Sequence, residues 1–196
     1  MTPQVIIISG PSASGKTTLA KTLQETLLPS VWLSFSVDTV IYSLPPTVLD
    51  RCNLENDWSG VDGKALFSGA LSSLRALVDS GNRVIFDVVL MSQIDIQRLL
   101  GHLSTLEVVS VALRSSWAEI KKRTMERGDR TLAEAQRSFD ACLRFSDSDL
   151  LFDTSELRAD EIAVRICRHI NDLAASENET GEQAAPEQPL PAPQFR

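Results

Sequence analysis

The feature that most constrains the fold is the stretch GPSASGKTT at residues 10–18, which directly follows the apolar run VIIIS. It matches the pattern G-x-x-x-x-G-K-[ST] at every fixed position, after a strand-like run and at the start of a helical pattern. Glycines let the backbone curl so that successive N–H groups point at phosphate oxygens, and the helix N-terminus adds its partial positive charge. The pattern predicts a phosphate-binding loop made of Gly10, Pro11, Ser12, Ala13, Ser14, Gly15, Lys16, Thr17 and Thr18.

Two residues of this loop have predicted chemical roles. Lys16 is expected to reach the β- and γ-phosphates of a nucleotide, and the Thr17 hydroxyl to ligate Mg²⁺. ATP and Mg²⁺ are therefore the expected cofactors. The alternative, a chance match in a turn rich in glycine and serine, is disfavoured by the strand–loop–helix context.

Apolar runs alternate with helical patterns along most of the chain. The predicted strands cover residues 5–9, 31–37, 83–90, 106–113 and 150–153, and the predicted helices cover 17–28, 64–78, 94–103, 117–126, 132–145 and 159–174. Uniformly apolar strands separated by helices predict an α/β fold with a parallel sheet covered on both faces. The region between 38 and 63 fits neither pattern clearly.

The chain divides into one predicted domain, residues 1–174, and a tail, residues 175–196. The tail is rich in Glu, Gln, Pro and Ala and is expected to be disordered, because it has too little apolar surface to bury. The length of 196 residues is typical of one domain.

Charge and composition exclude several function classes. The 19 basic and 26 acidic residues give a net charge of −7, which disfavours nucleic acid or an anionic membrane as the main partner. No apolar run reaches the roughly 18 residues of a membrane span. The 3 cysteines form no CxxC pair and indicate a reducing compartment, so we expect a cytoplasmic protein. The oligomeric state is not predicted.

The rest of the sequence discriminates between three uses of a bound nucleotide. A regulatory GTPase needs a guanine-reading element such as Asn-Lys-x-Asp, and none occurs. A motor ATPase usually has a longer chain and an Asp-Glu pair at a strand end, whereas here Asp87 is followed by Val88. Small size and compact alternation favour a kinase that phosphorylates a small molecule or a nucleotide.

The segment RGDR, residues 127–130, lies between two helical patterns. Two arginines three residues apart on a connecting segment can clamp nucleotide phosphates and neutralise charge on the transferred group. We therefore predict catalytic roles for Arg127 and Arg130, and Arg123, one helical turn earlier, is a further candidate. The alternative is an ordinary basic helix end followed by a glycine C-cap.

Two carboxylates end predicted strands. Asp38 follows the strand VWLSFSV, and the carboxyl end of a parallel strand is where such sheets bind ligands. Its alternative role is to cap a helix that starts near Thr39. Asp87 ends the strand RVIFDVVL as a candidate ligand of Mg²⁺ or of the acceptor, and a purely structural role is the alternative.

The acceptor pocket is expected between the second strand and the helix that precedes the third. Apolar candidates there would suit an amphipathic alcohol, although each residue alone is more often part of a core. These candidates are Tyr42, Trp58, Phe67 and Met91, with Asp50 and Arg51 as polar ones. Trp32 is expected to pack in the core, and His102 and His169 to be surface or packing residues.

The combination of GPSASGKTT, PSVWLSFSVDTVIYSLPP, RVIFDVVL and RGDR resembles the chloramphenicol phosphotransferase-like family, P-loop kinases related to shikimate and adenylate kinases. The resemblance covers about residues 4–172. It implies a three-layer fold with a five-stranded parallel sheet in the order 2-3-1-4-5. It also implies that Asp38 accepts the proton of the acceptor hydroxyl, that residues 10–18 bind ATP and that Arg127 and Arg130 are lid arginines.

By this resemblance the protein transfers the γ-phosphate of ATP to a hydroxyl of a small molecule, with chloramphenicol or a similar antibiotic as a candidate. Antibiotic resistance and a metabolic role both remain open as its biological purpose. A nucleotide or sugar-acid kinase and a non-catalytic nucleotide-binding regulatory or toxin-like module are the alternatives. The chain departs from the family in one place, because Asp87 is followed by Val88 where a second aspartate is common.

Overall fold

A parallel β-sheet forms the centre of the molecule. The structure is a computed structural model that describes residues 3–128, 130–142 and 148–181. Five strands pair in parallel in the order β2-β3-β1-β4-β5, which confirms the predicted fold class. The strands are β1 (Val5–Ser9), β2 (Trp32–Ser36), β3 (Arg83–Val88), β4 (Val108–Arg114) and β5 (Leu150–Asp153).

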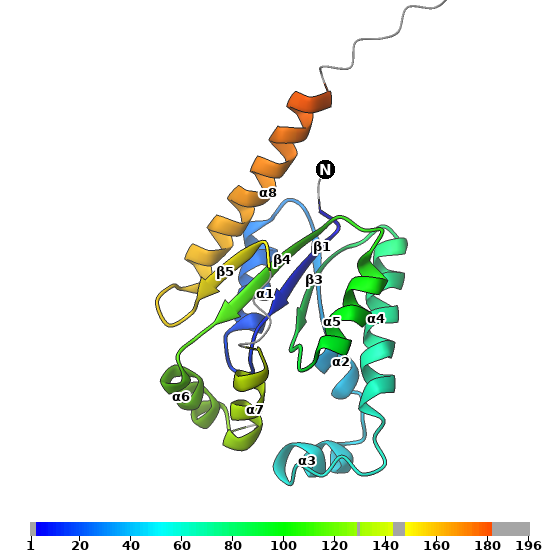
Figure 1. The fold of residues 1–196 in the computed structure, drawn as a ribbon, viewed down its shortest axis with the longest axis vertical. Helices are drawn as coiled ribbons and strands as arrows, with labels where there is room; N and C mark the ends of the chain where they lie inside the picture. The colour runs from blue at the N-terminus through cyan, green and yellow to red at the C-terminus, as the bar shows by residue number, and fades with distance from the viewer. Residues whose placement is uncertain (1–2, 129, 143–147, 182–196) are drawn as a thin grey trace, which may run out of the picture.

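Helices cover both faces of this sheet (Figure 1). The helices are α1 (Lys16–Thr26), α2 (Val37–Ile41), α3 (Pro46–Leu54), α4 (Gly63–Asp79), α5 (Gln93–Leu103), α6 (Trp117–Arg127), α7 (Leu132–Cys142) and α8 (Ala159–Gly181). Helices α1 and α8 pack on one face, and α4 and α5 pack on the other.

The central strand β1 contributes to two separate cores. Side chains alternate between the faces of a strand, so Ile6 and Ile8 pack with α1 and α8 while Val5 and Ile7 pack with α4 and α5. All four are buried. Because both faces of β1 are covered, its first four residues, VIII, are continuously apolar rather than alternating.

Two regions differ from the sequence-based prediction. The unassigned region between 38 and 63 contains α3 and most of α2, which begins at Val37, the last residue of the predicted strand 31–37. Pro46 occupies the first turn of α3, where its missing N–H is harmless. Helix α8 continues to Gly181 instead of ending at Ala174, and its last turns extend beyond the sheet in Figure 1. The residues ASENET include good helix formers, which explains the longer helix. The end of the predicted helix at 143–145 and the tail residues 182–196 lie outside the described residues.

The carboxyl ends of all five strands lie at one edge of the sheet, because the strands are parallel. Ser36 of β2 pairs with Asp87 of β3, and Ser9 of β1 pairs with Val88. The segments after β1, β2 and β3 therefore start next to one another. Helices α3, α6 and α7 lie at the same edge (Figure 1). Within the described ranges, no helix is long and apolar enough to cross a membrane.

Candidate active site

The phosphate loop after β1 adopts a conformation that depends on its glycines. Gly10 has φ 156°, and a Cβ there would lie 2.6 Å from the Leu113 carbonyl oxygen. Gly15 has φ 94° and precedes the first residue of α1. Both values are unfavourable for residues with a side chain. The loop therefore curls tightly between β4 and the N-terminus of α1, as the motif predicted.

Lys16 extends back across this loop. Its side chain is 8% exposed, and Nζ donates a hydrogen bond to the Pro11 carbonyl oxygen at 2.9 Å. Burial lowers the pKa of Lys16 below its ordinary value, and the negative charges of Asp87 and Asp38 oppose that shift. The cation is thus held where phosphate oxygens would meet the loop.

Asp87 and Thr17 bring two side-chain oxygen groups into contact. The Thr17 hydroxyl donates a hydrogen bond to Asp87 Oδ2 at 3.1 Å, and Asp87 is 7% exposed. Burial raises the pKa of Asp87, while the nearby charge of Lys16 and the Thr17 hydrogen bond act in the opposite direction. Mg²⁺ in phosphoryl-transfer sites uses one or two protein oxygens together with phosphate oxygens, so this pair fits that ion.

Asp38 is paired with one of the predicted lid arginines. Arg130 Nη2 donates to Asp38 Oδ2 at 2.7 Å, and Nη1 donates to the Ser12 hydroxyl at 3.2 Å. The N-cap of α2 is Ser36, whose hydroxyl accepts a hydrogen bond from the Thr39 N–H, so the capping role considered for Asp38 is wrong. Arg130 instead joins Asp38 to the phosphate loop.

One cavity of about 370 Å³ brings these groups together. Its polar lining includes phosphate-loop residues with Asp38, Asp87, Arg127, Arg130, Glu134, Arg137 and Ser138. Its apolar lining consists of Val37, Ile41, Trp58, Val88, Val89 and Met91 beside Ala13. A nucleotide phosphate and an amphipathic acceptor could thus share one space.

Only part of the predicted acceptor pocket lies in this cavity. Trp58 and Met91 line it. Tyr42 is 50% exposed and does not line it, and Phe67 is buried in the core between α4 and the sheet. Asp50 is exposed on α3. Arg51 instead supports a loop, because it donates to the Ser59 carbonyl oxygen and lies 3.4 Å from Asp57.

The residues predicted to be structural behave as expected. Trp32 is buried in the core, with the Arg83 guanidinium over its ring. His102 and His169 are partly exposed helical residues. Within the described ranges there is no cluster of three or more His, Cys, Asp or Glu side chains that could hold a metal ion.

The sequence analysis missed the contribution of α7. Glu134, Arg137 and Ser138 all line the cavity. The Ser12 N–H donates to Ser138 Oγ at 2.8 Å, and Arg137 Nη2 donates to Asn56 Oδ1 at 2.7 Å. The spacing of three and four residues, which places side chains on one helix face, was the available signal. The spacing alone does not show that this face of α7 lies against the phosphate loop.

Arg123 lies at a different cavity, of about 350 Å³. It donates to the Thr154 carbonyl oxygen at 2.8 Å and to the Thr154 hydroxyl at 3.1 Å. The two cavities share Gly15 and Thr18 of the phosphate loop. Arg123 thus lines a different cavity from Arg127 and Arg130.

Comparison with protein families finds a match over most of the chain. The model of the chloramphenicol phosphotransferase-like proteins matches residues 3–171, which is nearly the whole described chain. No curated protein matches the sequence.

Solved structures share the fold at low sequence identity. The tunicamycin resistance protein of Deinococcus radiodurans is 21% identical with a TM-score of 0.61, over 87% of this chain and 96% of that one. A gluconokinase of Sinorhizobium meliloti 1021 is 16% identical with a TM-score of 0.66, over 93% and 98%. The shikimate kinase of Acinetobacter baumannii is 17% identical with a TM-score of 0.60, over 87% and 94%. These similarities establish the P-loop kinase fold.

Proposed function

The chain belongs to the chloramphenicol phosphotransferase-like family, and we propose that it is an ATP- and Mg²⁺-dependent phosphotransferase that phosphorylates a hydroxyl of a small molecule. One observation carries this proposal. The carboxylate of Asp38, the buried Lys16 and the apolar surface around Trp58 line the same cavity. That combination supports binding of a phosphate donor beside an acceptor that has an apolar body.

Phosphoryl transfer passes through a loose transition state, so catalysis depends mainly on positioning and charge neutralisation. Asp38 orients the acceptor hydroxyl and takes its proton as the oxygen–phosphorus bond forms. Lys16 binds the phosphate that moves, and Arg127 and Arg130 neutralise the charge that spreads over it. Thr17 and Asp87 would hold Mg²⁺, which would supply further neutralisation of phosphate charge when bound.

The nucleotide and the acceptor have separate places in this proposal. The phosphates lie on the loop, where the two cavities meet at Gly15 and Thr18. The base extends toward Arg123 in the smaller cavity. The acceptor lies in the larger cavity against Trp58 and Met91, with its hydroxyl at Asp38.

Chloramphenicol or a similar antibiotic is the proposed acceptor class, and drug resistance in the cytoplasm is the proposed role. The apolar lining, which includes Val37, Ile41 and Val88, supports an amphipathic alcohol. Among the proteins with this fold, one is described as a tunicamycin resistance protein and others as gluconokinase or shikimate kinase. The compounds in these names are therefore included among the acceptors to be tested.

The test is ATP consumption by the purified protein with Mg²⁺ and one acceptor at a time. The panel contains chloramphenicol, related amphenicols, tunicamycin, gluconate, shikimate and nucleoside monophosphates. We expect turnover with at least one amphipathic alcohol. The Asp38→Asn variant should lose about 10²–10⁴-fold in kcat, the range for a positioned proton acceptor, and should still bind ATP.

Lys16→Ala serves as the second variant, because it should weaken ATP binding as well as turnover. If Asp38→Asn turns over a proven acceptor as fast as the unmodified protein, the role of Asp38 is wrong. Turnover with gluconate or a nucleoside monophosphate alone would favour the sugar-acid or nucleotide kinase. ATP binding without turnover on the whole panel would favour a nucleotide-binding regulatory module.

A further inference from the structure

A loop beside the cavity forms a hydrogen bond with α7. This loop, residues 55–62 between α3 and α4, is called the acceptor loop below. Arg137 Nη2 on α7 donates to Asn56 Oδ1 in the loop at 2.7 Å. The two residues are 81 positions apart in the sequence, so the bond joins two elements that the chain itself does not connect directly.

The acceptor loop also forms hydrogen bonds within itself and with the end of α3. The Asp57 carboxylate accepts a hydrogen bond from the Ser59 N–H at 2.9 Å, and Arg51 of α3 lies 3.4 Å from it. Hydrogen bonds from Ser59 lower the pKa of Asp57, and the charge of Arg51 adds to this effect. Asn56 has φ 55°, a left-handed conformation that asparagine tolerates better than most residues. Trp58, which lies between Asp57 and Ser59 in the sequence, lines the cavity.

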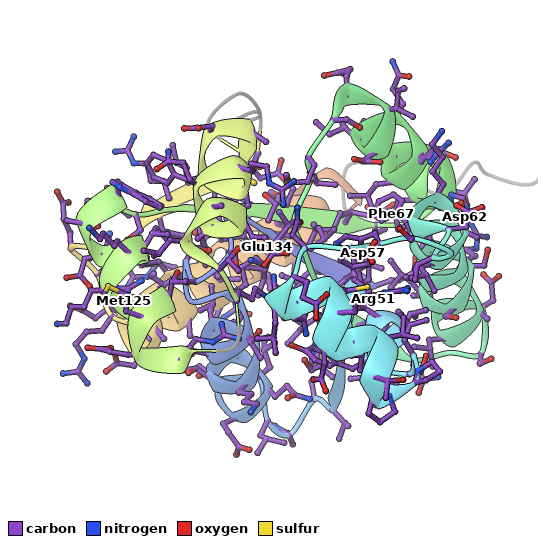
Figure 2. All side chains as sticks on the ribbon, turned by 90° about the horizontal axis from the view of Figure 1, so that it is seen from below. Arg51, Asp57, Asp62, Phe67, Met125 and Glu134 are labelled. Atoms are coloured by element: carbon purple, nitrogen blue, oxygen red, sulfur yellow. The ribbon has the colours of Figure 1, made fainter. Side chains whose placement is uncertain are left out.

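Helix α7 is also tied to the phosphate loop. Ser138, the residue after Arg137, accepts the hydrogen bond from the Ser12 N–H, and both residues are buried. Figure 2 looks onto the carboxyl ends of the strands and shows Glu134 of α7 and Asp57 of the acceptor loop extending from separate segments at this end of the sheet. On α7, Arg137 thus contacts the acceptor loop, and the next residue, Ser138, contacts the phosphate loop.

We propose that Arg137 and Asn56 are positioning residues whose hydrogen bond latches the acceptor loop to α7. The latch thereby holds Trp58 against the acceptor and fixes its position relative to the phosphate loop. The latch itself stands on the geometry alone, and its role in phosphoryl transfer rests on the proposed function. Arg137 is exposed, so the latch can open without unfolding the domain.

Hydrogen exchange of the intact protein tests the latch without an acceptor. The amides of Asp57, Ser59 and Val61 donate hydrogen bonds within this region and report its opening. In Arg137→Met, these amides should exchange about tenfold faster, the effect of losing one hydrogen bond to a charged group. Arg168→Met, at an exposed position on α8, is the matched control and should leave their exchange unchanged.

Variants of Asn56 test the same bond from the other side. Asn56→Gly tolerates the left-handed backbone but removes the accepting oxygen, so it should accelerate exchange as Arg137→Met does, after correction for the intrinsic rate of glycine. Asn56→Asp keeps an accepting oxygen and should retain slow exchange. The Arg137→Met and Asn56→Gly effects should not add, because each removes the same bond.

A non-hydrolysable ATP analogue with Mg²⁺ tests the coupling between the two sides. It should slow exchange in residues 10–18 of every variant, but slow exchange in the acceptor loop only where the latch is intact. Unchanged loop exchange in both Arg137→Met and Asn56→Gly would overturn the proposal, as would equal acceleration in Arg168→Met. Absence of any protection in residues 10–18 would instead contradict the proposed function, while the ligand-free comparison would still decide the latch.

Discussion

At the scale of single residues, Arg130 depends on its planar guanidinium as well as its charge. Two of its nitrogens bond to two different partners, Asp38 and Ser12. A lysine has one ammonium group and cannot reproduce that fork. We expect Arg130→Lys to lower kcat/KM about 10- to 100-fold despite the conserved charge, measured with an acceptor from the panel.

The matched control for this prediction is Arg168→Lys on the exposed surface of α8, which should leave kcat/KM unchanged. Equal activity of Arg130→Lys and the unmodified protein would mean that a point charge at this position is sufficient.

Asp87 couples the stability of the metal-free protein to pH. Burial raises the pKa of this carboxyl above its ordinary value of 3.8. Between 3.8 and the raised pKa, the folded protein binds more protons at Asp87 than the unfolded chain does. The contribution of Asp87 to the free energy of unfolding therefore falls as pH rises through that window.

Urea denaturation of the metal-free protein between about pH 4 and about pH 7 measures this contribution. The free energy of unfolding of the unmodified protein minus that of Asp87→Asn should decrease as pH rises. A flat or rising difference would show that Lys16 and Thr17 stabilise the ionised carboxylate of Asp87 enough to offset the effect of burial on its pKa.

At the scale of elements, α4 begins with a side-chain cap that sets where the acceptor loop ends. Asp62 Oδ1 accepts hydrogen bonds from the Lys64 and Ala65 N–H groups at 3.0 and 3.1 Å. Figure 2 shows Asp62 at the start of this helix, with Phe67 farther along it. We expect Asp62→Ala to reduce the free energy of unfolding by about 1 kcal/mol, measured by urea denaturation.

Asp62→Asn should keep most of that stability, because asparagine is an equally good cap. Ser73→Ala, at an exposed position in the middle of the same helix, is the control and should not destabilise. Equal stability of Asp62→Ala and the unmodified protein would show that the bounds of α4 are set by core packing alone.

At the scale of the whole molecule, β1 links the two cores, one on each face of the sheet. Ile6 is fully buried against α1 and α8. We expect Ile6→Ala to cost about 2–5 kcal/mol of unfolding free energy, because it leaves a cavity that the packed sheet cannot fill. This is a large fraction of the roughly 5–15 kcal/mol of a typical domain. Thermal and urea unfolding measure the loss.

Leu151→Ala on β5 provides the comparison, since that side chain is 45% exposed. It should cost far less than Ile6→Ala. Similar costs for both variants would contradict the assignment of β1 as the centre of the packed structure.

Local patterns were sufficient to predict the framework of the site. The motif at 10–18 predicted a strand, a curled loop and a helix, because its glycines and its lysine work only in that arrangement. Apolar runs without alternation predicted a sheet covered on both faces, and the resemblance to the kinase family supplied the strand order. Asp38 and Asp87 were found because the first follows a predicted parallel strand and the second lies near the end of another, and all such ends meet at one edge of the sheet.

Only the tertiary structure decided which side chains meet at that edge. Arg130 pairs with Asp38 across 92 positions and Arg137 with Asn56 across 81, and such contacts leave no period in the local sequence. The same limit explains Tyr42, because an aromatic residue in an irregular region does not reveal which way it points. Phe67 lies in the predicted helix, but the helical period does not reveal whether its apolar face meets the core or the cavity. The sequence by itself determined the phosphate loop and the parallel α/β framework through short-range geometry. The partners of Asp38, the role of α7 and the true lining of the cavity depend on packing between distant segments.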